Sequence, residues 1–195
     1  MGIEKTRREV IRLRTEFKQE PRQGALRLAQ QLSWYSMELA LAKEYEKSNA
    51  AWTEAFDVAR YTLRDGGPTQ YERTELIRIG VGTARSRLIV GEDEGALKVL
   101  EQTEAQYDAL VAEATDPEIM LALRGPILSA RAAVHHDRGE RDEEIADLCE
   151  SVLEMLAGYE ANPRIVESML REPLRTLHEL LSADEAEPEP EADAA

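Results

Sequence analysis

Residues 87–100 read RLIVGEDEGALKVL, and the run GEDEG at its centre decides how the chain folds. A calcium loop of the EF-hand type needs oxygen ligands spread over about twelve residues, and a phosphate-binding loop needs a lysine after its glycines; neither pattern is present here. Acidic residues instead favour the first turn of a helix, and glycine supplies the positive φ that ends one. We therefore interpret Gly91 as the corner between two helices.

A similar stretch, RGERDEEIADL, recurs at residues 138–148, so that Gly139 lies 48 residues after Gly91. This alignment places Leu97 on Ile145, Leu100 on Leu148, Ala84 on Ala132 and Arg87 on His135. A third and weaker copy is centred on Asn49, 42 residues before Gly91, where Ala55 and Val58 hold the offsets of Leu97 and Leu100. Each copy predicts a long helix, a tight turn and a second amphipathic helix.

Composition favours the same fold class. The 195 residues are 43% hydrophobic but only 5% aromatic, and apolar residues recur every three or four positions, with no convincing period of two. Breaks fall at Pro21, residues 65–68, Asp116–Pro117 and Asn162–Pro163, in addition to the two glycine corners. The sequence therefore predicts an all-α chain of about seven to eight helices, stacked as antiparallel hairpins.

The expected organisation is one domain over residues 1–182. Within it, residues 1–20 form an N-terminal capping helix, 24–160 the hairpins and 163–182 a C-terminal capping helix. Residues 183–195 are acidic, carry two prolines and lack large apolar side chains, which predicts a disordered tail. Between residues 24 and 47 the apolar side chains point in almost every direction, which predicts a helix enclosed by its neighbours.

Local signals refine the helix ends. Residues 69–72, TQYE, predict a capping box, and Asp116 and Asn162, each followed by proline, predict helix starts. Pro126 and Pro173 fall within helical patterns, so we expect a kink or a restart at both.

The small residue Ala84 or Ala132, the turn glycine Gly91 or Gly139, and the small residue Ala96 match the motif of one known family. On these residues the chain resembles the tetratricopeptide-repeat-like helical hairpin superfamily over roughly residues 24–160. It departs from that pattern in its longer repeat, in Glu144 at the position of Ala96, and in lacking a tryptophan-leucine-glycine opening. The resemblance implies a stack with a concave face that holds a peptide or helix of a partner protein.

Charge and composition restrict the classes of function. The net charge of −15 makes the body unfavourable for nucleic acid, whereas residues 1–27 hold eight Lys/Arg against four Glu. No apolar run reaches the length of a membrane span and no signal-peptide core follows Met1, so we expect no membrane contact and a cytoplasmic location. The single cysteine, Cys149, excludes an internal disulfide, and its apolar neighbours predict a core thiol.

Candidate chemistry is sparse. Gly80 and Gly82 form a GxG that follows no strand, so we interpret them, with Ala84, as small residues at a close helix approach. His135 and His136 are consecutive and point about 100° apart, which predicts one in the hairpin interface and one toward solvent. No serine or cysteine has an evident base. We therefore expect no enzyme activity, no cofactor and no metal.

Three hypotheses for interaction follow. The first is a protein-binding module, whether adaptor, chaperone or regulatory subunit, in which Arg78, Arg85, Leu88 and His136 line the partner-binding face and the arginines meet an acidic segment. The second is a nucleic-acid-associated regulator that docks through Arg7, Arg8, Arg12 and Arg14. The third is self-assembly into a homo-oligomer through the apolar stripe Val166, Leu170, Leu177 and Leu181 on the last helix.

Overall fold

The computed structural model describes residues 2–64, 66–113, 123–157 and 163–186, and these residues form eight α-helices and one 3₁₀ helix, with no strand among them. The elements are α1 (Ile3–Gln19), α2 (Pro21–Leu41), α3 (Tyr45–Ala59), η1 (Arg60–Leu63), α4 (Gln70–Ile89), α5 (Asp93–Glu113), α6 (Arg124–Arg138), α7 (Arg141–Ala157) and α8 (Pro163–Ala186). The predicted all-α fold class is confirmed.

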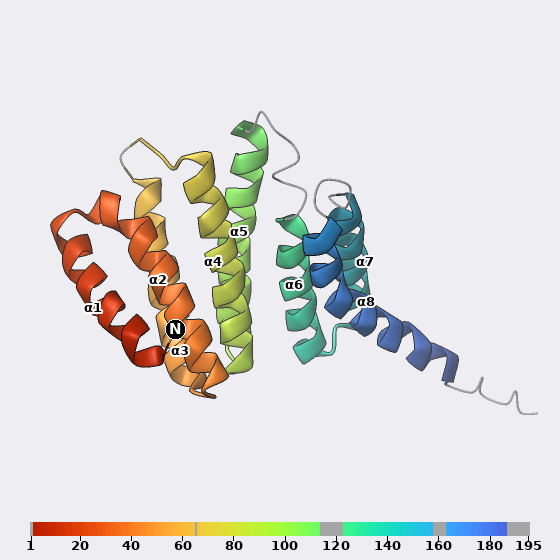
Figure 1. The fold of residues 1–195 in the computed structure, drawn as a ribbon. Helices are drawn as coiled ribbons and strands as arrows, with labels where there is room; N and C mark the ends of the chain where they lie inside the picture. The colour runs from red at the N-terminus through yellow and green to blue at the C-terminus, as the bar shows by residue number, and fades with distance from the viewer. Residues whose placement is uncertain (1, 65, 114–122, 158–162, 187–195) are drawn as a thin grey trace, which may run out of the picture.

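The helices pack in chain order. α2 with α3, α4 with α5, and α6 with α7 form three antiparallel hairpins, while α1 and α8 lie at the two ends of the row (Figure 1). The first helix of each hairpin also contacts the first helix of the next, α2 with α4 and α4 with α6. Equivalent positions of successive hairpins are therefore brought to the same side of the molecule.

Each hairpin turns through the same backbone motif. Lys43, Gly91 and Gly139 adopt positive φ values of 62°, 76° and 69°. The amide of the following glutamate donates across each corner: Glu44 to the carbonyl of Leu39, Glu92 to that of Arg87, and Glu140 to that of His135, each at 2.9 Å. This is the Schellman pattern of helix termination. Two of the three corners lie at the predicted glycines.

The first corner lies elsewhere than predicted. Asn49 is buried inside α3, and the turn falls at Lys43. The steps from residue 43 to 91 and from 91 to 139 are both 48 residues, so the repeat is more regular than the alignment on Asn49 indicated. The prediction was wrong because lysine is a rare residue at positive φ and marks no corner in a sequence.

Small residues let the two helices of each hairpin cross closely next to the corner. On the first helix these are Ser36, Ala84 and Ala132, all buried. On the second they are Ser48 and Ala96, and the Ser48 hydroxyl donates to the Ser36 carbonyl at 2.9 Å. In the third hairpin the matching position is Glu144, also buried. This glutamate is the one large side chain at the three equivalent crossings.

The enclosed helix is α4, not the predicted 24–47 segment. Ten residues of α4 are buried on several sides, whereas Trp34 and Leu41 of α2 are 60% and 86% exposed. α4 has α2, α3, α5 and α6 as neighbours. A Cβ atom added to Gly80 would overlap the side chain of Thr103, and one added to Gly82 would overlap Trp52, so the predicted close approach at these glycines is confirmed.

The apolar core is continuous from α1 to α6, and a smaller cluster joins α7 to α8. The smaller cluster consists of Val152 and Met155 of α7 with Val166 and Leu170 of α8. Half of the stripe proposed for self-assembly is thus buried within the chain. Leu177 is half-buried and Leu181 is exposed, so only the end of the stripe is open to a second copy.

The local signals have mixed outcomes. Pro126 falls in the first turn of α6, so the expected restart is present, but α8 runs through Pro173 without restarting. α8 begins at Pro163 and continues to Ala186, four residues into the segment predicted to be a disordered tail. Asp116, Asn162 and residues 187–195, for which the sequence predicts two helix starts and a disordered tail, lie outside the described residues.

The predicted capping box at the start of α4 is confirmed. The Glu72 amide donates to the Thr69 hydroxyl at 3.2 Å, and the Thr69 amide donates back to the Glu72 carboxylate at 2.8 Å. Arg22 of α2 donates to the same carboxylate at 2.9 Å. The Arg22 hydrogen bond, helped by the Thr69 amide and hydroxyl and opposed by partial burial, lowers the pKa of Glu72 from 4.5 to about 2.

We predict that Glu72→Gln lowers the thermal unfolding temperature at neutral pH. Because the pKa of Glu72 is lower in the folded chain than in the unfolded one, its carboxylate stabilises the fold above pH 4.5. That contribution is lost as the pH falls from 4.5 toward 2, so the two proteins should converge over that range. Circular dichroism melts across the range measure the difference. A gap that stays constant with pH would contradict the assignment.

We also predict that Gly139→Ala lowers the free energy of unfolding by about 1 kcal/mol, since an L side chain at positive φ is strained. No atom lies within 4 Å of the added Cβ, so the cost comes from the backbone alone. Lys43→Gly removes the side chain at the equivalent corner, so it should raise the free energy of unfolding or leave it unchanged. Gly2→Ala is the matched control, because Gly2 has open space but a φ of −91°. Urea unfolding measures all three.

Candidate partner-binding groove

A groove of about 470 Å³ lies where α4, α6, α7 and α8 meet, beside the corner of the third hairpin. Its lining residues are Arg85, Leu88 and Ile89 from α4; Ser129, Ala132, Ala133, His136 and Asp137 from α6; Glu144 and Leu148 from α7; and Glu172, Pro173, Thr176 and Glu179 from α8. A second cavity of about 470 Å³ adjoins it and shares His136, Glu144, Thr176 and Glu179. The two cavities form one surface, which we call the α8 groove.

Three of the four residues predicted for partner binding line this groove: Arg85, Leu88 and His136. Arg85 is exposed, and its guanidinium lies 3.4 Å from the Ser129 hydroxyl across the groove. Arg78 lies outside the lining, exposed and paired with Glu75 at 2.9 Å. The structure therefore brings Arg85, Leu88 and His136 together in one groove and leaves Arg78 outside it.

Sequence reasoning missed the α8 wall of the groove. Glu172, Pro173, Thr176 and Glu179 face residues of α4 and α6 that are far away in the chain. The only sequence signal was the amphipathic pattern of this helix, which predicts a buried stripe but not the element that buries it. Pro173 is buried, so its side chain is part of the packed wall.

The lining combines buried apolar side chains with acidic ones, of which Glu144 is buried and Asp137, Glu172 and Glu179 are exposed. Leu148 and Ala132 are buried and Leu88 is half-buried, whereas Ile89 is 61% exposed. Asp137, Glu144, Glu172 and Glu179 supply four carboxylates, against one arginine, Arg85. In the adjoining cavity Arg141 adds a second guanidinium, which donates to the Leu180 carbonyl at 2.6 Å.

Further exposed apolar side chains lie on α2, at repeat positions equivalent to those of the groove residues on α4. Met37 and Leu41 hold the repeat positions of Arg85 and Ile89, 48 residues earlier, and both are exposed. Trp34 precedes Met37 by three residues and so lies on the same side of α2. Because α2 packs beside α4, this side of the first helices presents large apolar side chains. Exposed apolar clusters of this kind mark interaction surfaces.

The two histidines separate as predicted. His135 is mostly buried in the hairpin interface, whereas the His136 side chain is 66% exposed. His136 Nδ1 lies 3.1 and 3.2 Å from the two carboxylate oxygens of Glu144, whose side chain is only 5% exposed. The exposed imidazole therefore covers a buried carboxylate at the junction of the two cavities.

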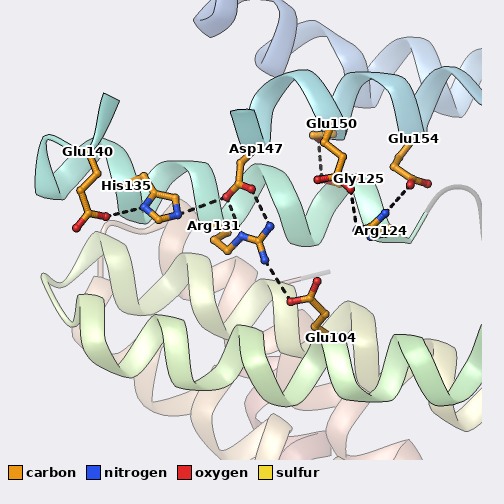
Figure 2. A network of polar contacts seen from close by, with 10 residues as sticks. Glu104, Arg124, Gly125, Arg131, His135, Glu140, Asp147, Glu150 and Glu154 are labelled. Atoms are coloured by element: carbon orange, nitrogen blue, oxygen red, sulfur yellow. Dashed lines mark hydrogen bonds and ion pairs between the residues drawn. The ribbon is translucent and has the colours of Figure 1, made fainter. Parts of the chain in front are cut away.

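A polar network fixes α6 and α7 on α5 (Figure 2). Arg131 of α6 donates twice to the Asp147 carboxylate of α7, at 2.8 and 2.7 Å, and once to Glu104 of α5 at 3.2 Å. His135 bridges Glu140 at 2.6 Å and Asp147 at 3.5 Å. The hydrogen bonds to Asp147, opposed by burial, raise the pKa of Arg131. This network sets the position of the α6–α7 hairpin, and with it one wall of the groove.

Cys149 is exposed, which corrects the prediction of a core thiol. Its neighbours Leu148 and Val152 are buried, but Cys149 lies on the side of α7 that carries Leu153 and Leu156, both exposed. A single step along the helix rotates the side chain by about 100°, which is enough to turn it from the core to solvent.

The arginines of the alternative hypothesis lie on α1 and are largely paired. Arg12 bonds Glu9 and Glu16, Arg14 bonds Glu54, and Arg7 lies 3.7 Å from Glu4. Arg8 has no ion pair within the described part of the chain. A cavity of about 920 Å³ along α1 is lined by acids as well as bases. The surface is therefore of mixed charge, and docking to nucleic acid through α1 stays a prediction.

Comparisons with protein-family models, with curated proteins and with solved structures found no match. Within residues 2–64, 66–113, 123–157 and 163–186, no helix is long and apolar enough to cross a membrane. A search of the same ranges for metal-binding groups of three or more His, Cys, Asp or Glu found none.

We predict that Arg131→Ala lowers the free energy of unfolding by about 1–3 kcal/mol, because it leaves the buried Asp147 carboxylate without its two strongest donors. Arg78→Ala is the matched control, since it removes an exposed pair with Glu75 and should have no measurable effect. Urea unfolding of both variants measures the difference. Equal stability of the two variants would show that the Arg131 network does not hold the hairpins together.

Proposed function

We propose that this protein is a non-catalytic interaction module that binds a segment of a partner polypeptide in the α8 groove. One observation carries the proposal: an open groove lined by apolar side chains and polar groups lies between α4, α6, α7 and α8, with Ile89 exposed at its edge. Exposed apolar side chains have a free-energy cost in water that burial against a partner would relieve.

The shape of the groove supports a polypeptide as the ligand. Each cavity of about 470 Å³ has room for a few side chains, and the two adjoin along α8. Such spacing suits a segment that anchors several side chains in turn. The tetratricopeptide-repeat-like resemblance implies the same kind of ligand, a peptide or helix of a partner protein.

The polar groups of the groove support binding in place of catalysis. The imidazole of His136 pairs with a carboxylate, Glu144, and the Ser129 hydroxyl pairs with the Arg85 guanidinium. Neither arrangement activates a nucleophile, which would require a base next to a hydroxyl or thiol. These groups can instead orient a bound chain by hydrogen bonds and charge.

The test is affinity purification of the full chain from its native host, followed by quantitative mass spectrometry. Ile89→Glu places a charge on the apolar edge of the groove at a 61% exposed position, so it should preserve the fold. We predict that it lowers recovery of the specific partner by at least about tenfold, as loss of an apolar anchor does.

Arg78→Glu is the matched control for that experiment. It introduces the same residue on the same helix, outside the groove lining, and should leave recovery unchanged. Circular dichroism establishes that both variants keep their helices. Partner recovery by Ile89→Glu equal to that of the unchanged protein would remove the α8 groove as the binding site.

A further inference from the structure

We infer that Glu144 is the anchor for a cationic side chain, arginine or lysine, of the bound segment, and that His136 occupies its place until the segment binds. This inference rests on the proposed function of the α8 groove. It also reverses the sequence expectation of an acidic partner segment.

The first observation is the repeat position of Glu144. Ser48 and Ala96 hold the same place in the other two hairpins, where a small residue lies against the first helix next to the corner. Both hairpins close with the same backbone motif without a carboxylate. The first turn of α7 favours acids, but Asp142 and Glu143 already meet that preference at exposed positions. The helix terminus therefore does not explain a buried glutamate at position 144, and residues that break a local rule tend to mark function.

The second observation is how Glu144 is paired. Its side chain is 5% exposed, and burying a carboxylate is costly unless it is well paired. Its partner His136 is 66% exposed, and that imidazole contacts Glu144 with one nitrogen. An exposed side chain can rotate away on a short timescale and uncover both carboxylate oxygens. A guanidinium could then bind those oxygens in a bidentate manner.

The third observation is the charge around the anchor. Glu172 and Glu179 on α8 and Asp137 on α6 line the same groove, against the one guanidinium of Arg85. Arg141 adds a cation in the adjoining cavity, but its guanidinium is directed to the Leu180 carbonyl. The groove is thus acidic where Glu144 lies, and it attracts a cation while repelling an acidic segment.

The surroundings define the rest of the segment. Glu144 lies in the lining of both cavities, with Leu88, Ile89 and Leu148 on one side and Leu180 on the other. A cationic side chain seated at Glu144 therefore has apolar neighbours in both directions. The fitting occupant is a basic amphipathic segment whose arginine or lysine is flanked by large apolar residues.

The experiment is selection from a random peptide display library on the immobilised full chain, with binding to Ile89→Glu used to identify groove-dependent peptides. We expect those peptides to be enriched in arginine or lysine next to apolar residues. Each is then measured by fluorescence anisotropy against the unchanged protein, Glu144→Ala, Glu144→Gln and His136→Ala. Replacing the anchor should weaken binding by at least about tenfold.

Folding controls separate the anchor from a structural role. Glu144→Ala recreates the residue of the equivalent position 96, so its unfolding temperature should not fall; Glu144→Gln keeps the side-chain shape if the alanine variant is less stable. His136→Ala removes the competing side chain and should leave affinity unchanged or increase it. A loss of affinity in His136→Ala would assign the contact to the imidazole and overturn the inference.

The outcomes for the two proposals are distinct. Groove-dependent peptides that lack arginine and lysine, or that bind Glu144→Ala and Glu144→Gln as tightly as the unchanged protein, would overturn the role of Glu144 while the α8 groove remains a binding site. A selection that yields only peptides insensitive to Ile89→Glu would overturn the groove itself, and the inference with it.

Discussion

The left-handed corner is the constraint on which the rest of the structure depends. At Lys43, Gly91 and Gly139 a single residue at positive φ ends one helix, and the next glutamate both closes that helix and begins the following one. The geometry of the turn fixes the angle between the helices, and the small residues beside it fix their separation. Because the motif returns every 48 residues, the first helices lie side by side and their equivalent positions form one surface. The α8 groove lies on that surface.

The third hairpin uses the same backbone but different side chains. Arg131 and Asp147 stand where the second hairpin has Thr83 and Val99, and Glu144 stands where it has Ala96. The Thr83 hydroxyl donates to neutral backbone carbonyls, that of Ile79 in its own helix at 2.8 Å and that of Trp52 in α3 at 3.1 Å. Arg131 instead reaches two other helices, so the contact of α6 with α5 depends on charge as well as on apolar packing. Hydrogen-bonded ion pairs restrict the relative orientation of two helices more strictly than apolar contacts do. Such restriction suits the α6–α7 hairpin, because that hairpin forms one wall of the α8 groove.

Local signals predicted much of the fold. Gly91, Gly139 and the Thr69–Glu72 capping box each act within one or two turns of a helix, and each is present where the sequence indicated. Lys43 was missed because its positive φ is imposed by the helices on either side, not by lysine itself. The aromatic and aliphatic residues of α2 were misassigned for a related reason: Trp34 and Leu41 read as core residues, but the helix row leaves them at the surface.

The groove was predictable only in part for the same physical reason. Arg85, Leu88 and His136 could be placed on one surface because the repeat relates them. No repeat relates α8 to the hairpins, so its packing depends on contacts between residues far apart in the chain. Cys149 shows how finely such packing depends on rotation, since it lies one position from the buried Leu148 and faces solvent.

α8 decides whether the surface is a groove or a plain face. Its first half is held by the apolar contacts of Val166 and Leu170 with α7, and these contacts are separate from the main core. Beyond Pro173 the helix gives Thr176 and Glu179 to the groove while Leu174 and Leu181 remain exposed. The wall is therefore attached at one end by a small apolar cluster and is only partly covered at the other. A segment that filled the groove would contact α8 and the hairpins together, so binding would also stabilise the docking of α8, by the general linkage between ligand binding and the conformation that binds it.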